Sequence, residues 1–308
     1  MLRAFFVHLS ENRSLRRFAE NSSIGRRVSG RFVAGTEIAD AVRVTQAVNR
    51  VGMSVSIDNL GENVRNPDEA RHSAQLYHQI LDAIITNQLN ANISLKLTHM
   101  GLDVDEAMSR DLVSGLVAKA ASMNPPGFVR VDMEGSPYTQ RTLDFVHELH
   151  RRPGHGNRVG TVIQSYLKRS EKDVADLLAE KIRIRLCKGA YKEPATIAYE
   201  SKTDVDGNYI KLMKMLLKSD VYHGLATHDE NIIRETQSFA TREKIARESF
   251  EFQMLYGIRR DLQQQLVKEG WRMRVYVPFG TEWYPYFMRR LGERPANVFF
   301  VARNLLRS

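Results

Sequence analysis

The sequence predicts an α/β protein folded as a (β/α)₈ barrel of the TIM type, with extra helices before the barrel. Two observations lead to this prediction. Short alternating or apolar segments typical of strands recur eight times, and a longer segment with helical periodicity follows each of them. Strands that alternate with helices imply a parallel sheet. Eight such units within 308 residues imply that the sheet closes into a barrel.

The predicted strands are short and end at polar or turn-forming residues. In chain order they are residues 53–58, 92–98, 128–133, 160–166, 183–188, 223–228, 250–255 and 272–280. The predicted helices are residues 37–50, 67–87, 105–122, 137–150, 171–178, 209–218, 229–243, 259–268 and 284–294. A polar excursion over residues 192–208 precedes the helix at 209–218.

The chain divides into two parts on this reading: a helical segment at 1–36 packed on the barrel, and the catalytic barrel at 37–308. The first 35 residues carry seven arginines and only two acidic residues, Glu11 and Glu20. A transit peptide would be rich in Arg and Ser and poor in acids, and the two glutamates interrupt that pattern. Helices docked on the barrel are therefore expected, and a membrane-surface role is the minority interpretation.

Composition is ordinary for a soluble globular chain, with 43% hydrophobic and 26% charged residues. The single cysteine, Cys187, excludes an internal disulfide. No apolar stretch approaches the ~20 residues that cross a bilayer. The net charge of +9 favours an anionic substrate, nucleotide, lipid surface or nucleic acid and does not choose among them.

Polar side chains recur where the predicted strands end. In a (β/α)₈ barrel those ends form the catalytic face. Each residue alone has a structural explanation, such as a helix cap at Asp229 or a small buried hydrophobe at Cys187. A purely structural rim would not need a polar group on nearly every strand. The residues concerned are Asp58, Asn59, Lys96, Thr98, His99, Asp132, Glu134, Gln164, Tyr166, Lys188, Tyr191, Thr227, His228, Asp229, Gln253, Tyr256 and Tyr276.

The helix after the eighth strand carries a tandem pair of arginines. Residues three and four apart share a helix face, so Tyr286, Arg289, Arg290 and Glu293 lie together and Glu293 is spaced to pair with Arg289. Guanidinium groups bind carboxylates and phosphates in a bidentate way. The alternative is an ordinary solvated basic face.

Other site types find little support. Gly154 and Gly156 precede a strand, whereas a dinucleotide loop follows a strand and opens a helix. There is no P-loop, and no set of His and acidic residues has metal-ligand spacing, so no metal is expected.

An ordered set of motifs resembles the monofunctional bacterial proline dehydrogenases, FAD enzymes built on a distorted (β/α)₈ barrel. The resemblance covers nearly the whole chain, and the last motif is highly specific. The motifs are Arg31-Phe32-Val33-Ala34-Gly35, Leu95-Lys96-Leu97-Thr98, Asp132-Met133-Glu134, Gln164-Ser165-Tyr166, residues 185–191 (RLCKGAY), Ala226-Thr227-His228, residues 252–257 (FQMLYG), residues 276–280 (YVPFG) and Tyr286-x-x-Arg289-Arg290-x-x-Glu293-Arg294.

This resemblance implies roles for individual residues. Arg289 and Arg290, helped by Lys96, would bind the proline carboxylate. Tyr286 and Glu293 would hold and cover them, and Leu255 and Tyr276 would shape the pocket. Asp132 and Tyr191 would lie at the catalytic centre. The implied FAD contacts are Met133, Gln164, Arg185, Cys187, Lys188, Gly189, Ala190, Thr227 and His228.

The implied reaction oxidises L-proline to 1-pyrroline-5-carboxylate, with electrons passed to a quinone-type acceptor. The resemblance also implies a bacterial cytoplasmic enzyme that does not bind nucleic acid. It leaves open whether the enzyme contacts the inner membrane peripherally and whether it passes its product to a separate pyrroline-5-carboxylate dehydrogenase. Two alternatives stand beside it. One is an aldolase-type barrel with Lys96 or Lys188 as a Schiff-base lysine. The other is a basic membrane- or nucleic-acid-binding module.

Overall fold

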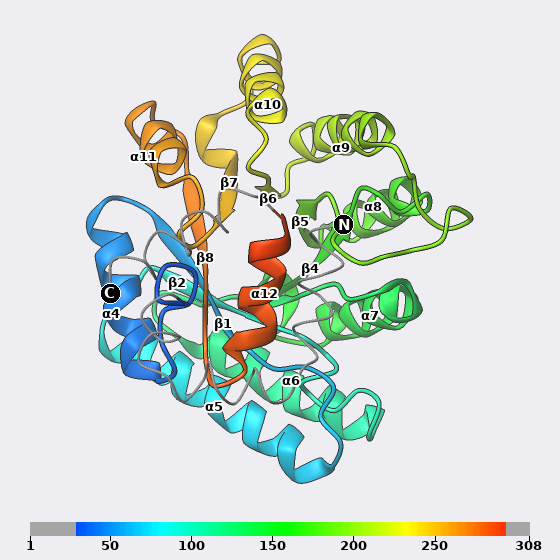
Figure 1. Ribbon diagram of the computed structural model, residues 1–308. Helices are drawn as coiled ribbons and strands as arrows, with labels where there is room; N and C mark the ends of the chain where they lie inside the picture. The colour runs from blue at the N-terminus through cyan, green and yellow to red at the C-terminus, as the bar shows by residue number, and fades with distance from the viewer. Residues whose placement is uncertain (1–28, 294–308) are drawn as a thin grey trace.

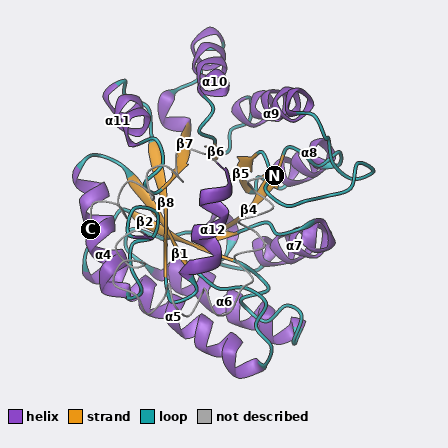
Figure 2. Cartoon of the chain, in the orientation of Figure 1, coloured by secondary structure: helices purple, strands orange, loops and turns teal. Residues whose placement is uncertain are grey.

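Eight parallel strands form a closed barrel surrounded by helices (Figures 1 and 2). The computed structural model describes residues 29–293. Each strand pairs with its neighbour in the chain, and β8 pairs with β1 to close the ring. The predicted (β/α)₈ barrel is therefore confirmed. The helices predicted before residue 29 lie outside the described residues.

The elements follow one another with short connections. The strands are β1 (Ser54–Asn59), β2 (Ala91–Leu95), β3 (Val129–Val131), β4 (Val159–Gln164), β5 (Arg183–Cys187), β6 (His223–Ala226), β7 (Phe250–Leu255) and β8 (Met273–Phe279). The α-helices are α4 (Ile38–Arg50), α5 (Pro67–Thr86), α6 (Glu106–Ser122), α7 (Ser136–Arg151), α8 (Ser170–Ala179), α9 (Lys202–Leu217), α10 (Glu230–Arg242), α11 (Arg260–Lys268) and α12 (Trp283–Glu293). Two 3₁₀ turns, Gly156–Arg158 and Arg247–Ser249, precede β4 and β7.

Two boundaries differ from the sequence prediction by three residues or more. Helix α9 begins at Lys202 rather than at residue 209, because Ser201 caps it by accepting a hydrogen bond from the backbone N–H of Asp204. The polar excursion is correspondingly shorter. Strand β2 ends at Leu95, before the predicted end at 98, so Lys96 and Thr98 stand on the loop beyond the strand.

The outer faces of the strands are apolar. Ile57, Ile93 and Phe252 pack with helix residues such as Tyr77 and Phe145 in one buried core. Burying a side chain of this size stabilises a fold by roughly 1.5–3 kcal/mol. This shell between strands and helices carries the hydrophobic core.

The inner faces of several strands are polar, although barrel interiors are usually filled by branched apolar residues. Two glycines make room for the larger polar groups. A Cβ at Gly224 would lie 2.2 Å from the Nε2 of Gln253, and one at Gly160 would lie 3.0 Å from a guanidinium nitrogen of Arg130. The interior is thus built to hold long polar side chains.

Helix α12 lies inside the ring formed by the other helices (Figure 1). Its residues Trp283 and Phe287 pack with Phe32, Leu60 and Ile258. Leu60 and Ile258 follow the carboxyl ends of β1 and β7, which places α12 at that mouth of the barrel.

The described part of the amino-terminal segment is tied to the same end. The N–H of Ala34 donates to the carbonyl of Pro278 (2.9 Å), and the N–H of Gly280 donates to the carbonyl of Gly35 (3.0 Å). Gly257 has a φ of +77°, and a Cβ there would lie 1.8 Å from the carbonyl oxygen of Arg31. The division of the chain at residue 36 stays a prediction.

Candidate functional site

The carboxyl ends of all eight strands meet at one mouth of the barrel, and most predicted site residues lie there. Gln164 and Cys187 end β4 and β5, Leu255 ends β7, and Tyr276 lies in β8 opposite Leu255 in the strand register. The predicted cofactor residues belong mainly to three neighbouring units, β4 to β6. The predicted substrate residues belong to β7, β8, β2 and α12, and β1 is the one strand between β8 and β2.

Arg185 is the centre of a buried polar network. Its Nε donates to Oε1 of Gln253 (2.5 Å), and its Nη1 donates to Oδ1 of Asp132 (2.7 Å) and Oγ of Ser94 (3.1 Å). Its Nη2 donates to Oγ of Ser56 across the barrel (3.0 Å). A guanidinium group has five N–H bonds. Four therefore have partners among residues 29–293, and one on Nη2 is left for another group.

Asp132 and Tyr276 belong to this network. Asp132 accepts hydrogen bonds from Ser94 (2.7 Å), Arg185 and the Tyr276 hydroxyl (3.0 Å). Burial, followed by the charges of Asp132 and Asp58, raises the pKa of Tyr276 well above its usual value. The phenol is therefore a hydrogen-bond donor at any working pH. Its ring also lies 5.3 Å from the Arg185 guanidinium, within cation–π distance.

Lys96 follows β2 at the same mouth, with its Nζ 3.8 Å from Oδ2 of Asp58. Burial alone would lower the pKa of Lys96, but the carboxylates of Asp58 and Asp132 outweigh it and raise that pKa above its ordinary value. Lys96 is thus a fixed cation suited to binding an anion. A Schiff-base lysine needs the opposite shift.

Gln164 provides a test of whether a cofactor fits. Its side chain is 3% exposed, and its Oε1 has no hydrogen-bond partner within the described part of the chain. A buried polar atom without a partner costs about 1–3 kcal/mol, so such atoms usually await a ligand or water. The carboxamide is a suitable partner for the hydrogen-bonding edge of a flavin ring. The Gln164 oxygen therefore fits the predicted FAD site.

The residues after β5 and β6 offer further polar groups. Lys188 lies between Asp206 (2.5 Å) and Asp229 (2.8 Å), which hold its ammonium in place. His228 accepts a hydrogen bond at Nε2 from the N–H of Leu255 (3.0 Å), so the neutral imidazole carries its proton on Nδ1. Burial raises the pKa of Cys187 to about 12, and the thiol stays neutral.

The remaining predicted cofactor residues lie beside these groups. Met133 and Thr227 are buried. Gly189 has a φ of +106°, and a Cβ there would lie 2.2 Å from the Tyr166 ring, so a larger residue cannot replace it without rearrangement. Ala190 and Tyr191 follow directly, and Tyr191 is 38% exposed.

On α12, Tyr286 is buried and the Arg290 guanidinium lies 5.0 Å from its ring. This contact brings together two of the predicted substrate residues. The side chains of Arg289 and Glu293 lie outside the described residues, and their pairing stays a prediction.

We call Ser56, Ser94, Arg185, Glu251, Gln253 and Arg274 the inner layer, since their side chains contact one another inside the barrel. Arg185 and Gln253 were among the predicted polar residues, but the sequence reasoning missed Ser56, Ser94, Glu251 and Arg274. A signal was present: Ser56 and Ser94 lie two positions before Asp58 and Lys96. Because alternate residues of a strand face the same side, stepping back by two identifies them.

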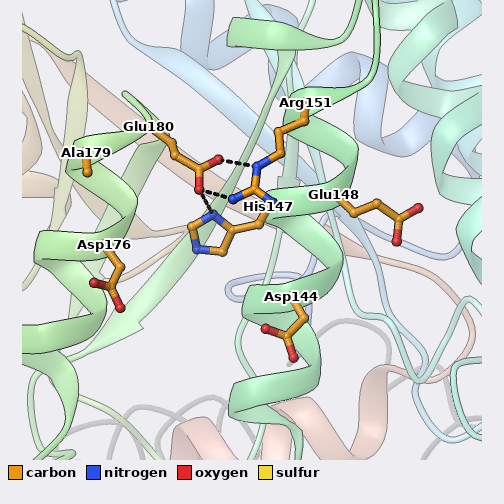
Figure 3. Close-up of a pocket in the computed structure, with 7 residues that line it drawn as sticks. All are labelled: Asp144, His147, Glu148, Arg151, Asp176, Ala179 and Glu180. Atoms are coloured by element: carbon orange, nitrogen blue, oxygen red, sulfur yellow. Dashed lines mark hydrogen bonds and ion pairs between the residues drawn. The ribbon is translucent and has the colours of Figure 1, made fainter.

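A surface groove of about 570 Å³ lies elsewhere, between α7 and the end of α8 (Figure 3). Figure 3 shows His147 and Arg151 pointing towards Glu180. His147 Nδ1 lies 2.9 Å from Glu180, and the Arg151 Nε also donates to it at 2.9 Å. These residues lie in the second half of α7 and at the end of α8, and none of them is a predicted site residue. We assign the groove no part in the site.

Comparison with known proteins agrees with this geometry. Residues 41–303 match the family profile described as proline dehydrogenase. The chain is 41% identical to proline dehydrogenase 1 of Bacillus subtilis strain 168 over 308 residues, all of both chains. It is 42% identical to the proline dehydrogenase of Deinococcus radiodurans over 281 residues, 90% of this chain and 89% of that one.

A solved structure gives the same result. Proline utilization A (PutA) from Bdellovibrio bacteriovorus, inactivated by N-propargylglycine, superposes with a TM-score of 0.80 at 25% identity. The match covers 87% of this chain and 32% of that chain, so the chain spans about a third of that protein. A family profile that spans most of the chain, relatives matched over nearly their full length and a shared barrel lead to one conclusion: the chain belongs to the proline dehydrogenase family.

Proposed function

We propose that this chain oxidises L-proline to 1-pyrroline-5-carboxylate, as an FAD-dependent oxidoreductase acting on a CH–NH bond. The observation that carries the proposal is a family match over nearly the whole chain, together with the Asp132–Arg185–Tyr276 cluster at the mouth of the barrel. When bound, FAD accepts the hydride from the ring carbon next to the proline nitrogen. Binding and orientation fall to the protein.

The FAD site in this proposal is formed by β4 to β6. Gln164 meets the flavin with its free carboxamide oxygen, and Arg185 offers its remaining N–H. Thr227 and His228 present polar groups from the neighbouring loop, and Lys188 adds a cation held by Asp206 and Asp229. The other members of the set are Met133, Cys187, Gly189 and Ala190.

The substrate site uses the opposite side of the mouth. Arg289 and Arg290 clamp the proline carboxylate, with Lys96 as a third cation. Fixing the carboxylate orients the ring carbon and supplies the proximity effect of catalysis. Leu255 and Tyr276 bound the space for the ring, while Tyr286 and Glu293 support the arginines.

Asp132 and Tyr191 lie at the catalytic centre in this proposal. Asp132 already accepts three hydrogen bonds, including one from the charged Arg185. Its role is therefore to orient Arg185 and the Tyr276 phenol rather than to remove a proton. Tyr191, which is partly exposed, covers the substrate from the loop after β5.

Electron transfer onward and product transfer are also proposed from the family. The acceptor is of the quinone type, and the product passes to a separate pyrroline-5-carboxylate dehydrogenase. The proposed location is the bacterial cytoplasm. In the described part of the chain, no helix has the length and hydropathy needed to cross a bilayer.

The test is spectroscopic. The purified protein should be yellow, lose its flavin absorbance on anaerobic addition of L-proline, and release all its colour into the supernatant on acid precipitation. A colourless protein, or one unchanged by proline, would refute the proposal. Colour retained in the pellet would refute non-covalent binding. Borohydride trapping with carbonyl substrates tests the aldolase alternative, which the raised pKa of Lys96 argues against.

A further inference from the structure

Glu251 is a buried carboxylate in β7 below the mouth of the barrel, and the chemistry proposed above does not use it. It is 4% exposed. Its Oε1 accepts from the Nε of Arg274 (2.6 Å) and the Nε2 of Gln253 (2.7 Å), and its Oε2 accepts from the Tyr222 hydroxyl (2.8 Å). Three donors from two strands and a loop therefore converge on one carboxylate.

The contact with Glu251 decides which way the Gln253 carboxamide points. A carboxylate only accepts hydrogen bonds, so the NH₂ of Gln253 must face Glu251. The oxygen of Gln253 then faces Arg185, whose Nε donates to it (2.5 Å). In the flipped orientation two acceptors would meet at Glu251 and two donors at Arg185. Glu251 thus keeps the Gln253 oxygen, a hydrogen-bond acceptor, facing the Nε of Arg185.

Arg185 is held on its other side by Asp132, which receives Nη1 (2.7 Å). With Ser94 and Ser56, four acceptors hold the guanidinium, and the orientation of one of them, Gln253, depends on Glu251. Gly224 keeps this arrangement possible, since a Cβ there would lie 2.2 Å from the Nε2 of Gln253.

We propose that Glu251 is a positioning residue, which orients Gln253 and through it fixes the Arg185 cation at the cofactor site. This rests on the proposed function, in which Arg185 lies against FAD. A cation held in one place stabilises added electrons more than a mobile one does. Loosening Arg185 should therefore lower the midpoint potential of the bound flavin.

The experiment measures that potential in the FAD-loaded enzyme. Gln253→Leu removes both contacts of Gln253. Glu251→Asp keeps a negative charge near Arg274 but withdraws the carboxylate oxygen that Gln253 and Arg274 share. We expect Gln253→Leu to reduce the relative stability of the reduced flavin about tenfold, roughly 30 mV for a two-electron couple. Glu251→Asp should shift the potential in the same direction. The double variant should match Gln253→Leu alone, because Glu251 acts through Gln253.

The matched control is Gln263→Leu. Gln263 is also buried, and its Nε2 donates to the carbonyls of Leu255 (3.1 Å) and Ile258 (2.8 Å), but it lies on α11 outside the barrel. Gln263→Leu should lower the free energy of unfolding without changing the midpoint potential of the bound flavin.

An unchanged potential in yellow Gln253→Leu, an equal shift in Gln263→Leu, or additive shifts in the double variant would overturn the inference. If Glu251→Asp does not fold, Gln253→Leu and its control still decide the question. Wild-type protein without FAD, or with FAD that proline does not reduce, would overturn the proposed function and the inference together.

Discussion

Two buried glutamines on the inside of the barrel differ in one respect. Gln253 in the inner layer uses both ends of its carboxamide, one on Arg185 and one on Glu251. Gln164 at the mouth has an oxygen with no partner in the described part of the chain. The Gln253 carboxamide is therefore completed by the protein itself, whereas the Gln164 oxygen has hydrogen-bonding capacity left for a ligand. The comparison separates residues that maintain the frame from residues that meet cofactor and substrate.

Breaking the inner layer should give the largest effect. Glu251→Leu leaves Arg274 buried without its ion-pair partner. Removing one member of a buried pair typically costs about 3–5 kcal/mol. We expect the free energy of unfolding, measured in urea, to fall by this amount. A loss below about 1 kcal/mol would show that the layer is not a rigid frame.

At the mouth, Arg290→Met should reduce catalysis rather than folding. Removing a charged partner from a desolvated pair costs ~2–5 kcal/mol. This corresponds to a roughly 30- to several-thousand-fold loss in kcat/KM for proline at ~1.4 kcal/mol per decade. FAD should stay bound, and Arg290→Lys should not restore full activity, because an ammonium lacks the bidentate fork. Arg289→Met should cause a similar loss in kcat/KM while FAD stays bound.

A surface arginine provides the control for that variant. Arg234 is 65% exposed and pairs with Glu230 one turn away on α10. Arg234→Met should keep normal kinetics. If the Arg289→Met and Arg290→Met proteins are yellow and have near-normal kcat/KM, the tandem arginines form an ordinary solvated basic face and do not bind the substrate.

Two buried histidines extend the comparison to pH. Burial, aided by the charge of Lys96, lowers the pKa of His99 at the mouth to about 3; burial, aided by Arg130 and Arg183, does the same for His223 at the start of β6. A folded-state pKa below the unfolded value of ~6.5 means that unfolding takes up a proton. This stability is fully present above pH ~6.5 and is lost as the pH falls towards 3.

Each histidine should lower the free energy of unfolding by ~1.4 kcal/mol for every pH unit of decrease between pH ~6 and ~4. His223 accepts at Nδ1 from the N–H of Ile184 (3.0 Å), a contact that His223→Asn can keep. Urea unfolding at several pH values measures this dependence. In His223→Asn the free energy of unfolding should fall less steeply with decreasing pH, by the contribution of one proton, ~1.4 kcal/mol per pH unit. An unchanged slope would mean that His223 is already charged in the folded protein.

Tyr276 joins the two regions, since its hydroxyl is held by Asp132 while its ring borders the proposed substrate space. Tyr276→Ser should free space for a ring hydroxyl and loosen the fit around proline. We expect the KM for hydroxyproline to fall relative to that for proline by up to about tenfold, ~1.4 kcal/mol. An equal ratio in wild type and variant would argue against a role in selectivity.

The sequence was sufficient for the barrel because hydrophobic periodicity is a local property. It also located most mouth residues, since they follow directly from strand ends. The start of α9 was missed because its first turn is polar, although Ser201 and Asp204 have the spacing of a helix cap. The pairing of Arg185 with Ser56 could not be predicted, because contacts across a barrel depend on how the sheet closes rather than on local pattern.

The most direct measurement compares Gln164 with Gln253. Gln164→Leu should weaken FAD binding by about 3- to 10-fold, the value of one hydrogen bond (~0.5–1.5 kcal/mol), while the flavin-free protein stays as stable as wild type or becomes more so. Gln253→Leu should instead destabilise the flavin-free protein. FAD titration of stripped protein and urea unfolding give both values. If Gln164→Leu lowers the free energy of unfolding and leaves the FAD dissociation constant unchanged, the division between inner layer and mouth is wrong.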